Sequence, residues 1–232
     1  MEKRKRMLLL VVALMVAVLW SSAAWALRPM GPPMAGLEQG QYSVGFDFSY
    51  SKMNAEIESE TVDDIESLAY LANLGYGISD NCEAFIRLGL AGIKDIGDSD
   101  QDFEGDNQFA YGFGIKGTFA EDDTLTWGGL FQMDWTKTED SDVEIDYYQI
   151  QIAAGPTYQM EGMSLFCGPF LHFADGEVDV SAIDETYDVE QESIFGGYVG
   201  AQFDIAENAS WNIEYQLTAD AYAICTGIEW RF

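Results

Sequence analysis

The sequence predicts an all-β fold: a closed antiparallel transmembrane β-barrel of about ten strands, with eight strands also possible. Runs of residues that alternate between apolar and polar with period two indicate the strands. The apolar side of these runs carries no charge. The connections alternate between short turns and longer acidic links, as they do in barrels that span a membrane.

Residues 1–26 have the composition of a secretory signal peptide. Lys3, Arg4, Lys5 and Arg6 form a basic start, residues 7–20 are apolar, and the chain then reads Ala-Trp-Ala up to Ala26. The apolar stretch is shorter than the roughly 20 residues that a membrane-spanning helix needs. We therefore expect cleavage after Ala26 and export of the rest. Residues 27–39 (LRPMGPPMAGLEQ), rich in proline, are expected to be a loose periplasmic lead-in to a barrel formed by 40–232.

Ten runs of alternating residues follow in the remaining chain. Each has its apolar or aromatic residues at every second position, with small or polar residues between them. In chain order, the runs are 42–51 (YSVGFDFSYS), 68–78 (LAYLANLGYGI), 84–90 (AFIRLGL), 109–119 (FAYGFGIKGTF), 125–135 (LTWGGLFQMDW), 148–160 (YQIQIAAGPTYQM), 165–173 (LFCGPFLHF), 195–205 (FGGYVGAQFDI), 211–217 (WNIEYQL) and 221–232 (AYAICTGIEWRF).

All charges inside these runs lie on the side opposite the apolar residues: Asp47, Glu83, Arg87, Lys116, Asp134, Asp204, Glu214, Glu229 and Arg231. A soluble β-sandwich also alternates, but its polar side faces water and would be crowded with charge. Here the polar side is rich in Gly, Ser, Gln and Asn, and the apolar side carries aromatic residues near the strand ends, as in membrane barrels. We expect the inward charges to form a paired network that closes the lumen. The excess of acids leaves a narrow cation-preferring channel as the alternative.

The connections predict the orientation of the barrel. Tight turns at 79–82, 120–123, 160–163 and 206–209 alternate with long acidic links at 52–66, 94–108, 137–146 and 174–193. Short turns face the periplasm in outer-membrane barrels, so the long links are expected outside the cell. The acidic segment 95–107 lacks the Gly and Glu positions of a calcium-binding loop. We expect diffuse attraction of divalent cations there and no defined metal site.

The end of the chain resembles the C-terminal signature of outer-membrane β-barrel proteins: Phe232 is terminal, with Trp230 and Ile228 at the preceding alternate positions. The architecture is similar to small OmpA/OmpX-type and opacity-like barrels, most of which have eight strands. The resemblance implies a location in the cell outer membrane, contact with outer-membrane lipid and lipopolysaccharide, and recognition of this tail by the barrel-assembly machinery. It also favours a structural or surface-interaction role.

Several functions are disfavoured by composition. A formal net charge of −29 argues against nucleic-acid binding. The three cysteines are widely spaced, and no metal or other cofactor is expected. A surface-exposed barrel enzyme is the least favoured alternative, because the single histidine, His172, has no partner in a pattern that resembles the barrel proteases or lipid A deacylases. We expect a lumen histidine and no catalytic site.

Overall fold

The computed structural model describes residues 27–57, 60–96, 107–140, 143–180, 185–190 and 194–232. These residues form eleven β-strands: β1 (Tyr42–Ile57), β2 (Glu60–Ser79), β3 (Cys82–Ile96), β4 (Gln108–Asp122), β5 (Leu125–Asp140), β6 (Val143–Met160), β7 (Met163–Val180), β8 (Glu185–Glu190), β9 (Phe195–Ala206), β10 (Ala209–Thr218) and β11 (Ala221–Arg231). The predicted signal peptide lies outside the described residues. Within the described ranges, no helix has the length and apolar character to cross a membrane.

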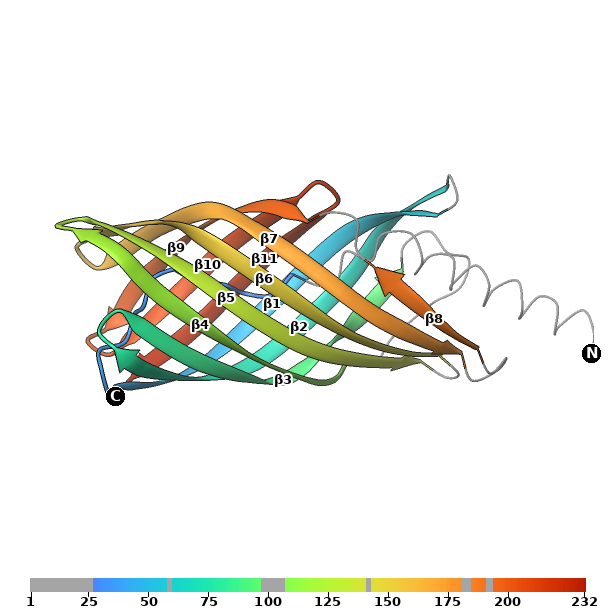
Figure 1. Ribbon diagram of the computed structural model, residues 1–232, viewed down its shortest axis with the longest axis horizontal. Helices are drawn as coiled ribbons and strands as arrows, with labels where there is room; N and C mark the ends of the chain where they lie inside the picture. The colour runs from blue at the N-terminus through green and yellow to red at the C-terminus, as the bar shows by residue number, and fades with distance from the viewer. Residues whose placement is uncertain (1–26, 58–59, 97–106, 141–142, 181–184, 191–193) are drawn as a thin grey trace, which may run out of the picture.

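The strands close into an antiparallel barrel (Figure 1), which confirms the predicted fold class. Neighbours in the chain pair with one another, and β1 pairs with β11 to complete the ring. Beyond the last ladder pair, Tyr42 and Phe232 exchange backbone hydrogen bonds of 3.2 and 2.8 Å. The apolar end of the chain is therefore part of the seam, because a sheet in lipid cannot leave a backbone edge unpaired.

Ten strands build the wall, and β8 prolongs one of them. Both β8 and β9 pair with β7, β8 along Asp175–Val180 and β9 along Met163–Leu171. The two short strands thus act as one interrupted strand of the wall. The predicted link at 174–193 did not anticipate this strand.

The strands are longer than the sequence runs. β1 and β2 continue into the predicted link at 52–66, and β5 and β6 leave only residues 141–142 between them. Backbone pairing therefore extends into the acidic segments, whose high charge hides the alternation at sequence level. The four tight turns lie as predicted at one end of the barrel, here called the turn end, and the opposite end is called the far end. Residues 97–106, most of the acidic segment 95–107, lie outside the described residues.

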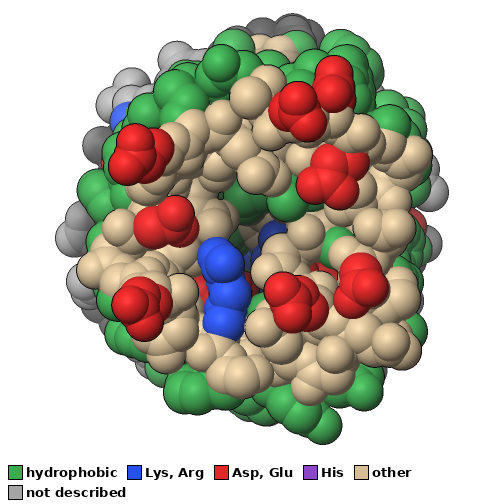
Figure 2. Space-filling view, turned by 90° about the vertical axis from the view of Figure 1, so that its left-hand side faces the viewer, with side chains coloured by type: hydrophobic (Ala, Val, Ile, Leu, Met, Phe, Trp, Pro, Cys, Tyr) green, Lys and Arg blue, Asp and Glu red, His purple; other side chains and the backbone are tan. Residues whose placement is uncertain are grey.

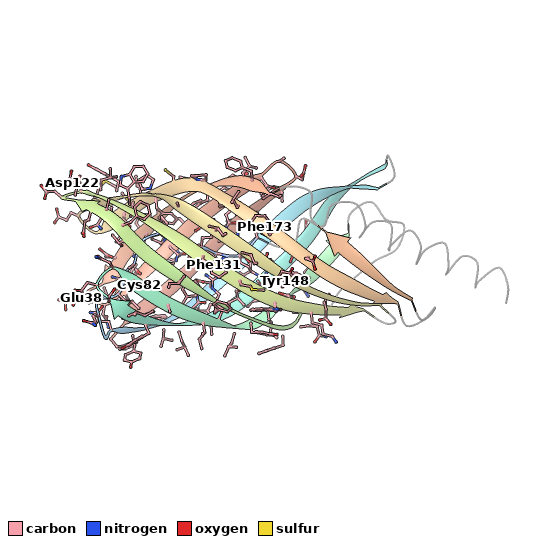
Figure 3. The ribbon with its side chains drawn as sticks, viewed as in Figure 1. Glu38, Cys82, Asp122, Phe131, Tyr148 and Phe173 are labelled. Carbon is pink, nitrogen blue, oxygen red and sulfur yellow. The ribbon has the colours of Figure 1, made fainter. Side chains whose placement is uncertain are left out.

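The two faces of the wall differ as the alternation predicts. Apolar side chains such as Phe46, Leu88 and Val199 are about half exposed on the outer surface, and side chains project outward all round the barrel (Figure 3). Inward residues such as Gln151 and Gln216 are completely buried. Inward residues at mid-barrel are therefore shielded from water, which indicates a filled interior.

Part of the filling is residues 27–37, and this corrects the expectation of a loose segment. Leu27, Arg28, Met30 and Leu37 are each exposed by 3% or less. The segment runs inside the barrel from the far half to the turn end, where the Gly40 N–H donates to the Gly77 carbonyl and the Gly77 N–H donates to the Gln41 carbonyl, next to the start of β1. Proline suggested looseness because it has no N–H for a sheet. The same property suits a chain whose contacts are made by side chains of the surrounding wall.

Candidate functional site: a lumen occupied by residues 27–37

Two lumen carboxylates hold the backbone of the inserted segment. Glu214 on β10 accepts N–H bonds from Gly31 at 2.6 Å and Met30 at 3.3 Å. Nearer the turn end, Glu83 on β3 accepts bonds from Gly36 at 2.7 Å and Leu37 at 3.2 Å. Hydrogen bonds to a charged acceptor are about twice as strong as neutral ones. Each carboxylate therefore acts as a clasp on two successive amides.

Lumen donors hold the carbonyl groups of the same segment. Arg87 donates to the Pro29 oxygen at 2.6 Å, and Gln132 donates to it at 3.3 Å. Gln216 donates to the Arg28 oxygen at 2.6 Å. Between them these three side chains satisfy carbonyls that would otherwise be buried without partners, which is costly in a dry interior.

A row of glutamines crosses the lumen beside the segment. Gln132 donates to Gln151 at 2.6 Å, and Gln151 donates to Gln216 at 3.1 Å. Gln151 lies on β6 and Gln216 on β10, which are not neighbours in the wall. The second bond therefore spans part of the bore, which the segment and the glutamines occupy together at mid-depth.

The deepest described side chain of the segment is a buried cation. Arg28 is fully buried, and its Nη2 donates to the hydroxyls of Thr136 at 2.8 Å and Tyr147 at 3.3 Å. Its Nε and Nη1 have no hydrogen-bond partner, and none of the described carboxylates lies within ion-pair distance of it. A buried charge with only neutral partners costs free energy.

Wall glycines make room for the segment. A Cβ at Gly128 on β5 would lie 2.5 Å from the Pro33 carbonyl oxygen and 2.7 Å from the Met34 Cα. A Cβ at Gly77 would overlap the Glu38 carbonyl group. The neighbouring Gly129 has only ordinary contacts at its Cβ position. Gly77 and Gly128 are thus a close fit to the chain that passes them.

The structure places the predicted network residues at different depths. Arg87 and Asp134 lie 3.8 Å apart at mid-barrel, and both are buried. Lys116 and Glu83 also lie 3.8 Å apart. Buried Asp47 accepts a 2.5 Å hydrogen bond from Asn73 and lines the same small cavity as Arg87, Glu83 and Lys116.

The remaining predicted charges lie at the turn end. Arg231 pairs with Glu229 at 3.2 Å, and Asp204 is exposed. These three side chains, with Lys116, line a cavity of about 270 Å³ between residues 32–36 and the wall. Figure 2 looks onto this end and shows acidic side chains gathered around an opening that holds basic ones. The predicted charges therefore extend from mid-barrel to the mouth, and the pair of Glu83 and Lys116 connects the two parts.

The predicted tail residues lie on the outer face of the seam. Trp230 and Ile228 are opposite Val44 and Phe46 of β1, and the Phe232 side chain is 70% exposed. Such a surface is open to lipid or to an assembly partner.

The histidine and the cysteines do not gather into one site, although Cys225 accepts a 3.8 Å hydrogen bond from Gln216. His172 is buried and shares a 3.0 Å hydrogen bond with Gln149. Cys167 is exposed on the outer face, Cys225 is buried, and all three cysteines are free. Among the described residues, no group of His, Cys, Asp and Glu could hold a metal ion.

Sequence reasoning missed the residues that receive the segment. Gln132, Gln151, Gln216 and Gly128 were seen at most as members of a polar inner face. One signal was available, because Leu27, Met30 and Leu37 are apolar residues in a segment expected to face water.

Comparison with known proteins agrees with the fold. Residues 13–224 match the family described as "Outer membrane protein beta-barrel domain". The chain belongs to this family. Its members are barrels of the outer membrane, so the barrel described here lies in the outer membrane. No curated protein sequence is significantly similar to it.

Solved barrels of this kind resemble the chain in structure at low sequence identity. An outer membrane channel from Pseudomonas putida F1 is 11% identical with a TM-score of 0.52, covering 89% of this chain and 100% of the channel. The translocator domain of the autotransporter NalP from Neisseria meningitidis is 10% identical with a TM-score of 0.50, covering 85% and 90%. The attachment invasion locus protein Ail of Yersinia pestis is 14% identical with a TM-score of 0.46, covering 84% and 99%. At these identities the likeness concerns the fold alone.

Proposed function

We propose that this outer-membrane barrel has a structural or surface-interaction role and that residues 27–37 keep its bore closed. The observation that carries the proposal is the burial of this segment, clasped by Glu83 and Glu214. The glutamine row supports it, because it occupies the bore beside the segment. A closed bore leaves the outer surface and the two ends as the places where the protein acts.

In this proposal the turn end faces the periplasm and the far end faces the outside. Tight turns at one end, and strands that extend into the acidic segments at the other, support the assignment. Outer-membrane lipid and lipopolysaccharide would contact the apolar wall, and the barrel-assembly machinery would bind the tail at Phe232. The proposed role is not enzymatic, and the hydrogen bond from buried His172 to Gln149 supports this.

A narrow cation-preferring channel is the second candidate. It is favoured by an excess of inward acids among the described residues: Asp47, Glu83, Asp134 and Glu214 are buried in the lumen with Arg28 and Arg87, and half-buried Lys116 lies beside Glu83. Acidic linings attract cations.

Conductance separates the two candidates. The full chain, refolded and inserted into a planar lipid bilayer, should give almost no steady current if the segment closes the bore. Detergent-matched bilayers without protein are the control. Stable, cation-selective openings of the unmodified protein would reject the closed barrel in favour of the channel.

A further inference from the structure

We propose that residues 27–37 are a removable stopper, and that their withdrawal through the turn end opens a passage for small cations. The inference rests on the proposed function, in which the inserted segment closes the bore. It adds that closure is reversible and that small cations would pass through the open bore.

The contacts of the segment are of a kind that water can replace. Its backbone is held by single side chains, such as Glu83, Glu214 and Gln216, and not by a β-ladder. In the described part of the chain, the backbone bonds to the wall nearest the segment are those that Gly40 and Gln41 make with Gly77, at the turn end. Withdrawal therefore breaks no strand pairing inside the barrel.

The segment has an exit with a hinge. Gly40, between the segment and β1, has a φ of 86°, and a Cβ there would meet nothing within 4 Å. Residues 38–40 are exposed at the turn end. A left-handed glycine in open space can change conformation without a steric cost. Rotation about this position can thus carry residues 27–37 out of the mouth without disturbing β1.

Arg28 opposes insertion. Two of its guanidinium nitrogens are buried without partners, and outside the bore they would be hydrated. The clasps by Glu83 and Glu214 favour insertion, whereas the Arg28 charge favours withdrawal. The favourable hydrogen bonds and the unfavourable burial of charge therefore oppose each other, which is the condition for a segment that can move both into and out of the bore.

Withdrawal also changes the charge of the bore. Arg28 leaves with the segment, so that Arg87 and Lys116 are the bases that remain beside four buried acids, Asp47, Glu83, Asp134 and Glu214. Two of those acids, Glu83 and Glu214, lose the amides that they held. The open bore is then lined by free carboxylates, has about the width of an extended chain, and selects small cations.

The test uses adjacent glycines of β5 in the full chain. In Gly128→Leu the new side chain would occupy the space of Pro33 and Met34, whereas in Gly129→Leu it has room on the opposite face. Both variants carry Met30→Cys as a reporter, with Cys82→Ser, Cys167→Ser and Cys225→Ala to remove the native thiols. Met30 is 1% exposed, so its replacement reacts with a membrane-impermeant maleimide only when the segment has left.

We expect roughly tenfold or faster labelling in Gly128→Leu than in Gly129→Leu, because labelling follows the population of the open form. Gly128→Leu should also conduct in a planar bilayer with cation selectivity, and Gly129→Leu should stay closed. Should Gly128→Leu fail to fold, Glu83→Gln combined with Glu214→Gln tests opening alone, with a weaker cation preference because two of the lining carboxylates are removed. Neutral acceptors hold amides more weakly, so labelling and current should rise together.

Fast labelling without current would overturn the proposal that residues 27–37 are the stopper, because the bore would then be blocked by other groups. Slow labelling of a folded Gly128→Leu barrel would overturn it too, because the segment would tolerate the added side chain. Steady current through the unmodified protein, with Met30→Cys still protected, would instead reject the closed barrel of the proposed function.

Discussion

At the scale of single residues, the lumen charges have specific partners. Arg87 forms an ion pair with Asp134, donates to the Pro29 carbonyl, and stacks its guanidinium 4.7 Å from the centre of the Phe85 ring. One side chain thus connects the wall to the inserted segment. On the outer face, Thr226 is a polar residue among apolar ones. Its hydroxyl donates to the Asn212 carbonyl and accepts a 2.7 Å bond from the Trp211 indole. A polar residue is tolerated toward lipid when its hydrogen bonds are satisfied.

Replacing Arg87 by methionine should destabilise the barrel by about 3–5 kcal/mol, because buried Asp134 loses its ion-pair partner. Urea unfolding of the barrel refolded into lipid vesicles measures the change. Adding Asp134→Asn should recover part of the loss, since the stranded charge is then removed. An Arg87→Met barrel as stable as the unmodified one would mean that the pair contributes nothing.

At the scale of elements, much of the wall could be predicted from the sequence, because period-two alternation reports which side of a strand is buried. In the links, charged residues mask the alternation. The prediction therefore missed the parts of β1 and β2 that lie there and the whole of β8. The lumen segment was missed for another reason. Alternation identifies an inward face, but it does not say whether water, side chains or another chain fills the space, and residues 27–37 pair with no strand.

The middle of β3 offers a test of the outer face. Leu88 is 47% exposed between Ala72 and Tyr111 on neighbouring strands. Leu88→Arg should cost about 2–4 kcal/mol, because it places a charge in the hydrocarbon region. Leu88→Met is the matched control and should be nearly neutral. Equal urea midpoints for the two variants in vesicles would argue that Leu88 lies outside the hydrocarbon region.

The prediction about assembly concerns the end of the last strand, β11. Deleting Phe232 removes two backbone bonds at the seam and the terminal aromatic side chain. We expect a sharp fall in the yield of inserted barrel in cells, read as the heat-modifiable band on a gel. Phe232→Tyr, which keeps the backbone and a ring, should insert normally. Unchanged yield after the deletion would remove Phe232 from the assembly signal.

At the scale of the whole molecule, export of the chain and its insertion into the outer membrane can be tested together. Because of the basic start and the Ala-Trp-Ala sequence, residues 1–26 should be removed and the protein should fractionate with the outer membrane. Intact-mass measurement of the purified barrel should give the mass of residues 27–232. A mass that includes Met1, or recovery in the soluble fraction, would contradict the signal-peptide assignment.

The seam between β1 and β11 also sets an order of events in folding. Most strands pair with a neighbour a few residues away in the chain, but the seam joins Ser43 to Arg231. Contacts so distant in sequence form late, because a long loop must close before they contribute. Until then the sheet is an open trough, with its glutamine row and clasping carboxylates accessible along the whole length. Residues 27–37 can be laid into the trough sideways during that interval, whereas after closure they can enter only end-on. A barrel whose seam closes before the segment is in place should therefore take the segment up afterwards through the turn end, and the speed of seam formation decides how many molecules first form with an empty bore.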